Sequence, residues 1–194
     1  MIQTGFVIEN PRMQSRIVVL ESDAETSGIG WLLEVTLGPG AGPVGLDHLH
    51  LTWTETFEII QGTAYYKLDG AQHTLQTGGR FTVTPRQHHV HPWSASDSAL
   101  VYRQRTDFGQ RDPGAVHNVL GAFATLAGLA QVGKVDKRWV PTNPLQLAAF
   151  LQVMVKHGTY GSSVPIAVQN LAAATLGRLA DALGYRGVYP QYVG

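Results

Sequence analysis

DHLHLTWTETFEIIQG, residues 47–62, combines strand-forming residues with two histidines and a glutamate at close spacing. His48 and His50 are separated by one residue, so on a β-strand both side chains point to the same face. Glu55 follows five residues after His50, and Gly62 closes the stretch. This pattern leaves two interpretations open: a metal site within a β-domain, or a polar strand at the edge of an ordinary sheet.

Short segments rich in β-branched and aromatic residues continue on both sides of this stretch, from the N-terminus to about residue 107. The segments that we expect to form strands are 15–21, 31–38, 56–62, 63–70, 80–85 and 99–106. Asp69-Gly70 has the composition of a tight hairpin turn. Many short strands at close spacing predict a mainly β fold, with the antiparallel strands forming a sandwich or a barrel.

From about residue 112 onward, the pattern is that of amphipathic helices. Helix starts are indicated at Asp112-Pro113, Asn143-Pro144 and Pro165, and Gly184 is placed to end the third helix. We therefore predict a β-domain at residues 1–110 and a helical extension at 111–194 with about three α-helices. The extension is expected to pack on the β-domain or to form a dimer contact.

Composition excludes several classes of function. Lys+Arg and Asp+Glu are equal at 14 each, which argues against a nucleic-acid partner because such proteins need a basic surface. The chain has no cysteine, so any metal site must use histidine and carboxylate ligands. The first residues lack the pattern of a signal peptide, and the longest helical segment is too polar to span a membrane. We therefore expect a cytoplasmic protein without a membrane partner.

Five of the eight histidines lie in two groups, one at positions 48 and 50 and the other at 88, 89 and 91. If the second group folds against the first, three imidazoles and the Glu55 carboxylate make a donor set for a divalent first-row metal such as Fe, Mn, Ni, Zn or Co. Such a set leaves coordination positions open for water or substrate. The alternative is that the histidine pair is simply solvated on a surface strand.

The spacing around these groups resembles the two-part motif of the cupin superfamily. The first part runs from Gly42 through His48, His50 and Glu55 to Gly62, and the second includes Gly79, Pro85 and a following histidine. The resemblance covers about residues 30–106 and is closest to cupins of the cupin 2 type with a helical tail. It implies a single jelly-roll-like antiparallel β-barrel, a homodimer, and His48, His50 and Glu55 as metal ligands.

The second part of the motif departs from the family pattern. Gln87 stands where glycine is usual, and Val90 stands where strict counting places the histidine. Because HHVHPW is similar to cupins that carry a His-x-His-Pro-Trp run, the resemblance favours His89 as the fourth ligand, with His91 as the alternative. His91 is also a candidate to face a substrate.

Inward-facing side chains of a cupin barrel line a cavity for a small organic molecule. The candidates here, of which about half are expected to face away, are His91, Trp53, Tyr65, Lys67, Trp93, Tyr102 and Gln104.

Three functional hypotheses remain open. The first is a metal-dependent enzyme, such as an oxygenase or an isomerase, acting on a small organic molecule. The second is a protein that binds metal or a small ligand without turnover. The third is the ligand-sensing domain of a regulator, which we rank last because the helices are mostly apolar and carry few charges. No general base beyond the predicted ligands is identifiable in the sequence.

Overall fold

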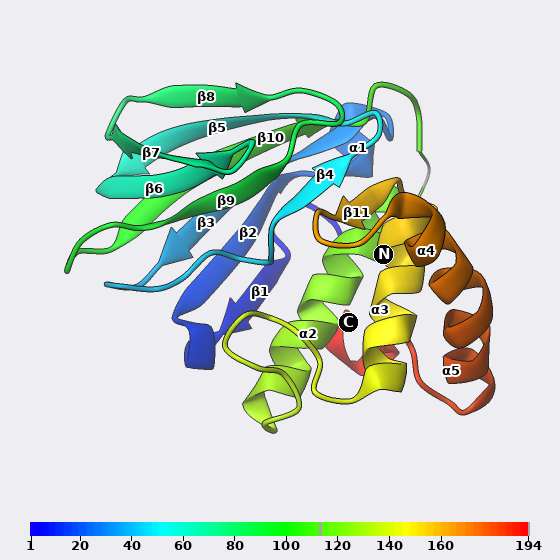
Figure 1. Cartoon of the computed structure of the whole chain (residues 1–194). Helices are drawn as coiled ribbons and strands as arrows, with labels where there is room; N and C mark the ends of the chain where they lie inside the picture. Colours follow the sequence, from blue (N-terminus) through cyan, green and yellow to red (C-terminus); the bar gives the residue numbers. More distant parts are fainter. Residues whose placement is uncertain (113, 194) are drawn as a thin grey trace.

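The computed structural model describes residues 1–112 and 114–193, which form two antiparallel sheets with the helices along one side (Figure 1). The six-stranded sheet has the order β1 (Val7–Asn10), β2 (Ser15–Glu21), β3 (Gly30–Leu37), β10 (Leu100–Asp107), β5 (Thr54–Gln61) and β8 (Arg80–Val83). The five-stranded sheet has the order β11 (Thr159–Gly161), β4 (His48–His50), β9 (His89–Ser94), β6 (Thr63–Leu68) and β7 (Ala71–Gln76). The predicted class, mainly antiparallel β followed by helices, is confirmed.

Alternation along the central strands separates the core from the outer surface. On β10, Tyr102, Gln104 and Thr106 are buried. Arg103 and Arg105 face outward and form ion pairs with Glu34 of β3 and Glu21 of β2. Because successive strand residues point to opposite faces, one register places every second side chain of β10 between the two sheets. The interior of the sandwich is therefore lined by a regular set of positions.

Tight turns connect the strands where the sequence predicts them. Asp69 and Gly70 have φ angles of 47° and 84° and join β6 to β7 in the expected hairpin. Gly62, between β5 and β6, has a φ angle of 92°, and a Cβ at this position would lie 2.7 Å from the carbonyl oxygen of Ala99. Gly62 is thus required both for its backbone conformation and for the close approach of a second segment.

The helices follow the predicted order. The π-helical turn η2 (Val116–Leu120) leads into α2 (Gly121–Gln131), and α3 spans Pro144–Lys156. The third helical segment is one continuous run made of α4 (Ile166–Ala172), the π-helical turn η3 (Ala173–Gly177) and α5 (Arg178–Ala182). The short elements are α1 (Asp23–Thr26), η1 (Pro11–Met13) and η4 (Pro190–Tyr192). None of the helices in the described part of the chain is long and apolar enough to cross a membrane.

Local signals account for several helix ends. The Asn143 side chain accepts hydrogen bonds from the backbone N–H groups of Leu145 and Gln146, at 2.8 and 3.2 Å, which confirms the predicted start of α3. Gly184 has a φ angle of 85° just beyond α5, as predicted for a helix stop. The predicted start at Asp112-Pro113 includes Pro113, which lies outside the described residues.

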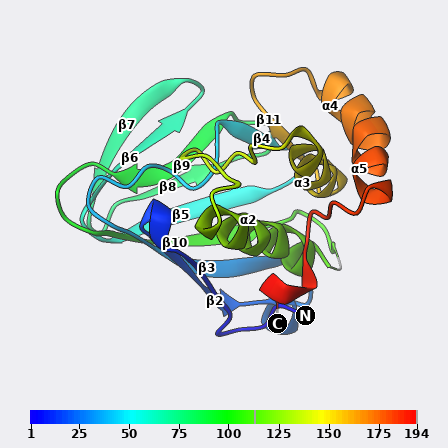
Figure 2. The same cartoon turned by 90° about the horizontal axis from the view of Figure 1, so that it is seen from below.

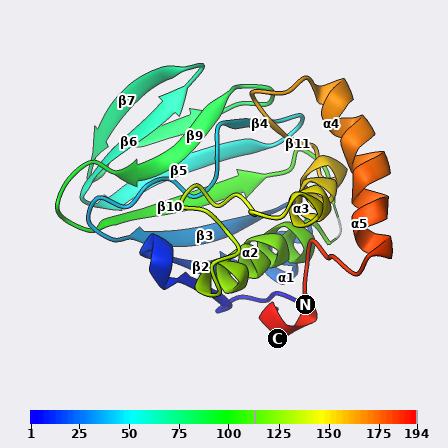
Figure 3. The same cartoon turned by 60° about the horizontal axis from the view of Figure 1, so that its bottom comes forward.

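The helices lie beside both sheets. Figures 2 and 3 show α2 beside the strands β2 and β3, with α3 next to it and the α4–α5 run on the outer side of α3. Strand β11, which follows α3, pairs with β4 so that Thr159 lies opposite His50 and Gly161 opposite His48. Residues far beyond the β-rich half of the sequence therefore extend the sheet that carries the first histidine pair.

We expect Gly62→Ala to destabilise the protein more than Gly70→Ala. Both substitutions place a side chain at a positive φ angle, at a cost of about 1–2 kcal/mol, but only the Cβ at position 62 meets backbone atoms. The free energy of unfolding in urea measures the difference. Equal losses for the two variants would contradict the steric role of Gly62.

Candidate metal centre

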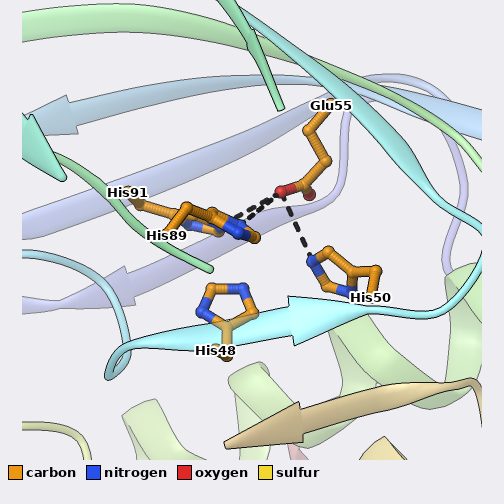
Figure 4. Close-up of side chains that lie close together, drawn as sticks. All are labelled: His48, His50, Glu55, His89 and His91. Atoms are coloured by element: carbon orange, nitrogen blue, oxygen red, sulfur yellow. Dashed lines mark hydrogen bonds and ion pairs between the residues drawn. The ribbon is translucent and has the colours of Figure 1, made fainter. Parts of the chain in front are cut away.

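Five side chains from three strands converge between the two sheets (Figure 4). They are His48 and His50 of β4, Glu55 of β5, and His89 and His91 of β9. One donor atom from each residue lies within 4.8 Å of the donor atoms of the others. All are buried except His48, which is partly exposed.

Strand pairing brings the two histidine groups together. His48 and His89 are direct partners in the antiparallel pairing of β4 and β9. The second histidine of each pair lies two residues further along its strand, so all four rings face the interior. Glu55 approaches from β5 in the opposite sheet, and its carboxylate reaches the histidine rings across the sandwich.

Backbone carbonyls set the orientation of two of the rings. The Nδ1 atom of His48 lies 2.7 Å from the carbonyl oxygen of Leu46, and the Nδ1 atom of His89 lies 3.2 Å from that of Gln87. A carbonyl can only accept, so each Nδ1 carries the hydrogen and donates it. In the neutral His48 ring the lone pair is then on Nε2, the tautomer that a metal ligand needs. His89 Nε2 also donates a hydrogen bond to Glu55, so this nitrogen must release its proton before it can bind a metal.

The His50 ring is held by two residues from different parts of the chain, Thr159 and Trp53. Its Nδ1 atom lies 2.9 Å from the hydroxyl oxygen of Thr159, which reaches the site from β11. On its other side, the ring stacks on Trp53 with the ring centroids 4.5 Å apart and the planes 18° apart. These two contacts fix the orientation of the His50 ring.

The Glu55 carboxylate is fixed through one oxygen and faces the histidines with the other. Gln104 Nε2 and Thr106 Oγ1 donate hydrogen bonds to Oε1 at 2.7 and 3.2 Å. Oε2 lies 2.9 Å from His89 Nε2. The carboxylate of Glu55 therefore keeps one oxygen directed at the centre of the cluster.

Burial and charge shift the pKa values of the cluster in different directions. Burial lowers the pKa of His48 well below its ordinary value, and the nearby His89 and His50 lower it further. Burial raises the pKa of Glu55, but the histidines outweigh this and hold it well below the usual range. Burial lowers the pKa of His89, but the hydrogen bond and charge of Glu55 outweigh it, so the net shift is upward. Glu55 is thus ionised and His48 neutral at neutral pH, the forms that bind metal.

The surroundings of two histidine ring nitrogens show whether the cluster is suited to a metal ion. Within the described chain, His50 Nε2 and His91 Nε2 are buried and have no hydrogen-bond partner. Each lies 3.4 Å from Glu55 Oε2, close enough for an ion pair but without hydrogen-bond geometry. Buried polar atoms without a partner are costly, and coordination to a cation removes that cost. Imidazole nitrogens and a carboxylate oxygen are the donors that a divalent first-row metal takes, so the residues fit such an ion.

A cavity of about 350 Å³ adjoins the cluster. His48, His50, Glu55 and His91 all line it, whereas His89 does not. The predicted pocket residues Trp53, Tyr102 and Gln104 also line this cavity. Much of the remaining wall consists of apolar side chains of α2 and α3, including Phe123, Leu126, Leu147, Phe150 and Met154.

The other three predicted pocket residues, Tyr65, Lys67 and Trp93, do not line this cavity. In the pairing of β6 with β9, Tyr65 lies opposite Trp93 and Lys67 lies opposite Val90. These partners are two residues apart on β6 but three apart on β9, so β9 contains one extra residue. This β-bulge reverses the alternation after His91 and directs Trp93 to the outer face of the sheet, where Tyr65 and Lys67 also lie. Ala64 and Tyr66, which alternate with them on β6, are buried.

Two polar residues of the site were missed by sequence reasoning. Thr106 shares the inward face of β10 with Tyr102 and Gln104, and continuing the period-two pattern by one step would have found it. Thr159 lies 109 positions after His50 in the chain, and no local pattern connects the two.

We expect Thr159→Val to weaken metal binding about 10- to 100-fold, the usual effect of removing a residue that orients a metal ligand. Valine preserves the shape and strand preference of threonine but cannot bond His50 Nδ1. Competition against a chromophoric chelator measures the affinity, with Thr74→Val on the exposed strand β7 as the control. Similar affinities in the two variants would contradict the role of Thr159.

No family model matches the chain, and no curated protein matches it either. Among solved structures, a predicted oxalate decarboxylase from Thermotoga maritima is 17% identical, covering 48% of this chain and 79% of that one, with a TM-score of 0.45. A double-stranded β-helix protein from Klebsiella pneumoniae is 18% identical, covering 54% and 86%, with a TM-score of 0.44. An RmlC-like cupin from Shewanella frigidimarina is 14% identical, covering 53% and 83%, with a TM-score of 0.42.

Similarity at this level says nothing about activity or ligand. The fold is recognised in the chain itself, which pairs two antiparallel sheets and carries histidines on β4 and β9 opposite a glutamate on β5. The chain therefore has a cupin-like fold, as the two-part histidine motif of its sequence implies.

Proposed function

We propose that this protein binds one divalent first-row transition-metal ion through His48, His50, Glu55 and His89, and that a small organic molecule binds beside it in the adjoining cavity. The observation that supports this proposal is the convergence of five donor groups on one point. In the described chain, two of their buried nitrogens have no hydrogen-bond partner: Nε2 of His50, a proposed ligand, and Nε2 of His91, the alternative to His89. The ion is Fe, Mn, Ni, Zn or Co, because these metals accept mixed imidazole and carboxylate ligands.

When bound, such an ion supplies an electrophilic centre for an oxygen or nitrogen donor of the organic molecule. The residues of the chain do the positioning. Gln104 and Thr106 hold the Glu55 carboxylate in one orientation, and Thr159 and Trp53 hold the His50 ring. The apolar wall of the cavity excludes water from the ligand.

The proposal has two leading forms, an enzyme and a binding protein, and they differ in whether the bound molecule is converted. Oxygenase or isomerase chemistry converts the bound molecule, whereas a binding protein releases it unchanged. The predicted homodimer and cytoplasmic location remain predictions from the sequence.

The assignment of His89 as the fourth ligand predicts unequal effects of two substitutions. The His89 ring is oriented by the Gln87 carbonyl and points Nε2 at Glu55, while His91 lines the cavity. We expect His89→Ala to lower metal affinity more than His91→Ala, as measured by competition with a chelator. Loss of metal only in His91→Ala would reverse the assignment.

Elemental analysis of protein purified without chelators tests the site itself. We expect about one equivalent of metal in the parent protein and its loss in His48→Ala and Glu55→Ala, since each change removes a donor from the cluster. His73→Ala, on the exposed strand β7, is the matched control and should retain the metal. Stoichiometric metal that survives both site substitutions would refute the proposed centre.

A further inference from the structure

The cavity beside the metal centre changes in polarity along its wall. At the cluster it is lined by histidines, Glu55 and Gln104, whereas α2 and α3 contribute apolar side chains. Phe123, Leu147 and Phe150 line it and are only partly buried. Such a wall suits a molecule that has one polar end and a larger apolar part.

The cavity reaches the surface between the loop before β4 and the start of α4. Leu46, Val164 and Val168 line the cavity, yet their side chains are 49%, 42% and 53% exposed. These three residues form the apolar part of its mouth, to which the exposed Ser163 and Arg138 also contribute. Arg138 is paired with Asp136, and the apolar side chains give the hydrocarbon part of a ligand a surface along which it can extend outward.

Two buried hydrogen-bond donors near the polar end have no partner in the described residues. They are the hydroxyl group of Tyr102 and Nε1 of Trp31, and both side chains line the cavity. Tyr102 lies two residues before Gln104 on the inward face of β10. Trp31 packs edge-on against Trp53, which stacks on His50. Unpaired buried donors are costly, so they indicate a ligand that supplies acceptors.

The net charge of the metal centre indicates which polar group the ligand carries. A divalent ion held by neutral imidazoles and one carboxylate leaves a single net positive charge in a largely apolar surrounding. An anionic oxygen donor compensates that charge, and a carboxylate also offers a second oxygen as an acceptor for a donor such as Tyr102.

We propose that the ligand is an amphipathic carboxylate, whose carboxylate group lies at the metal centre and whose hydrocarbon part fills the apolar cavity toward Leu46, Val164 and Val168. This inference rests on the proposed function, because the metal ion anchors the carboxylate. It adds the chemical class of the ligand and the part of the chain, α2 to α4, that selects it.

Isothermal titration calorimetry of zinc-loaded protein with acetate, butanoate, hexanoate, octanoate and decanoate tests the inference. Zinc is redox-inert, so binding is measured without turnover. We expect affinity to increase about fourfold with each added methylene until the cavity is filled, since burying one methylene contributes about 0.8 kcal/mol. Octanol should bind more weakly than octanoate, because it lacks the anionic end.

Two exposed positions on α4 provide a matched pair of variants. Val168 lines the cavity and Leu171 does not, although both are exposed. We expect Val168→Lys to weaken decanoate binding at least tenfold, about the contribution of two methylenes, and to leave acetate binding unchanged. Leu171→Lys should affect neither. Leu147→Gln, at a partly buried position of α3, should also weaken decanoate selectively.

The outcomes separate the two proposals. An affinity that does not depend on chain length, or equal effects of Val168→Lys and Leu171→Lys on decanoate, would overturn the amphipathic ligand while the metal centre stands. Zinc content is measured on the same samples. If the parent protein does not retain zinc, both the metal centre and the carboxylate inference fail.

Discussion

The buried carboxylate of Glu55 is the interaction on which the site depends. Its side chain is 1% exposed, and an ionised group so deeply buried must be paired and hydrogen-bonded. One oxygen is held by Gln104 and Thr106 of β10, and the other faces histidines carried by β4 and β9. Removing one partner of such a buried pair costs about 3–5 kcal/mol. The carboxylate thereby ties both sheets to the same geometry.

The helical part of the chain completes the site as well as covering it. Strand β11 extends the sheet at β4 and brings the Thr159 hydroxyl to the His50 ring. Helices α2 and α3 then supply the apolar wall of the cavity beside the histidines. The β-rich segments alone would leave this wall open, so the ligand preference of the protein depends on residues that lie outside the two-part motif.

Features of the structure that depend on residues close together in the sequence were predicted, whereas features that depend on distant residues were not. The shared face of His48 and His50, the hairpin at Asp69-Gly70 and the cap at Asn143 depend on neighbours within a few positions, and the sequence predicted all of them correctly. Trp93 was a predicted pocket residue two positions after His91, but an added residue in the pairing of β6 and β9 turns it to the other face.

Strand alternation and turn conformation are local properties, so the sequence predicted a mainly β fold with His48 and His50 on one face of a strand. The internal donor cluster followed only from the resemblance of the spacing to the cupin motif. Tertiary packing determined the rest: the convergence of His89 and His91 on one centre, the contact of Thr159 with His50, and the cavity between the sheets and α3. These features require segments far apart in the chain to pair in one register, and no short stretch of sequence contains that information.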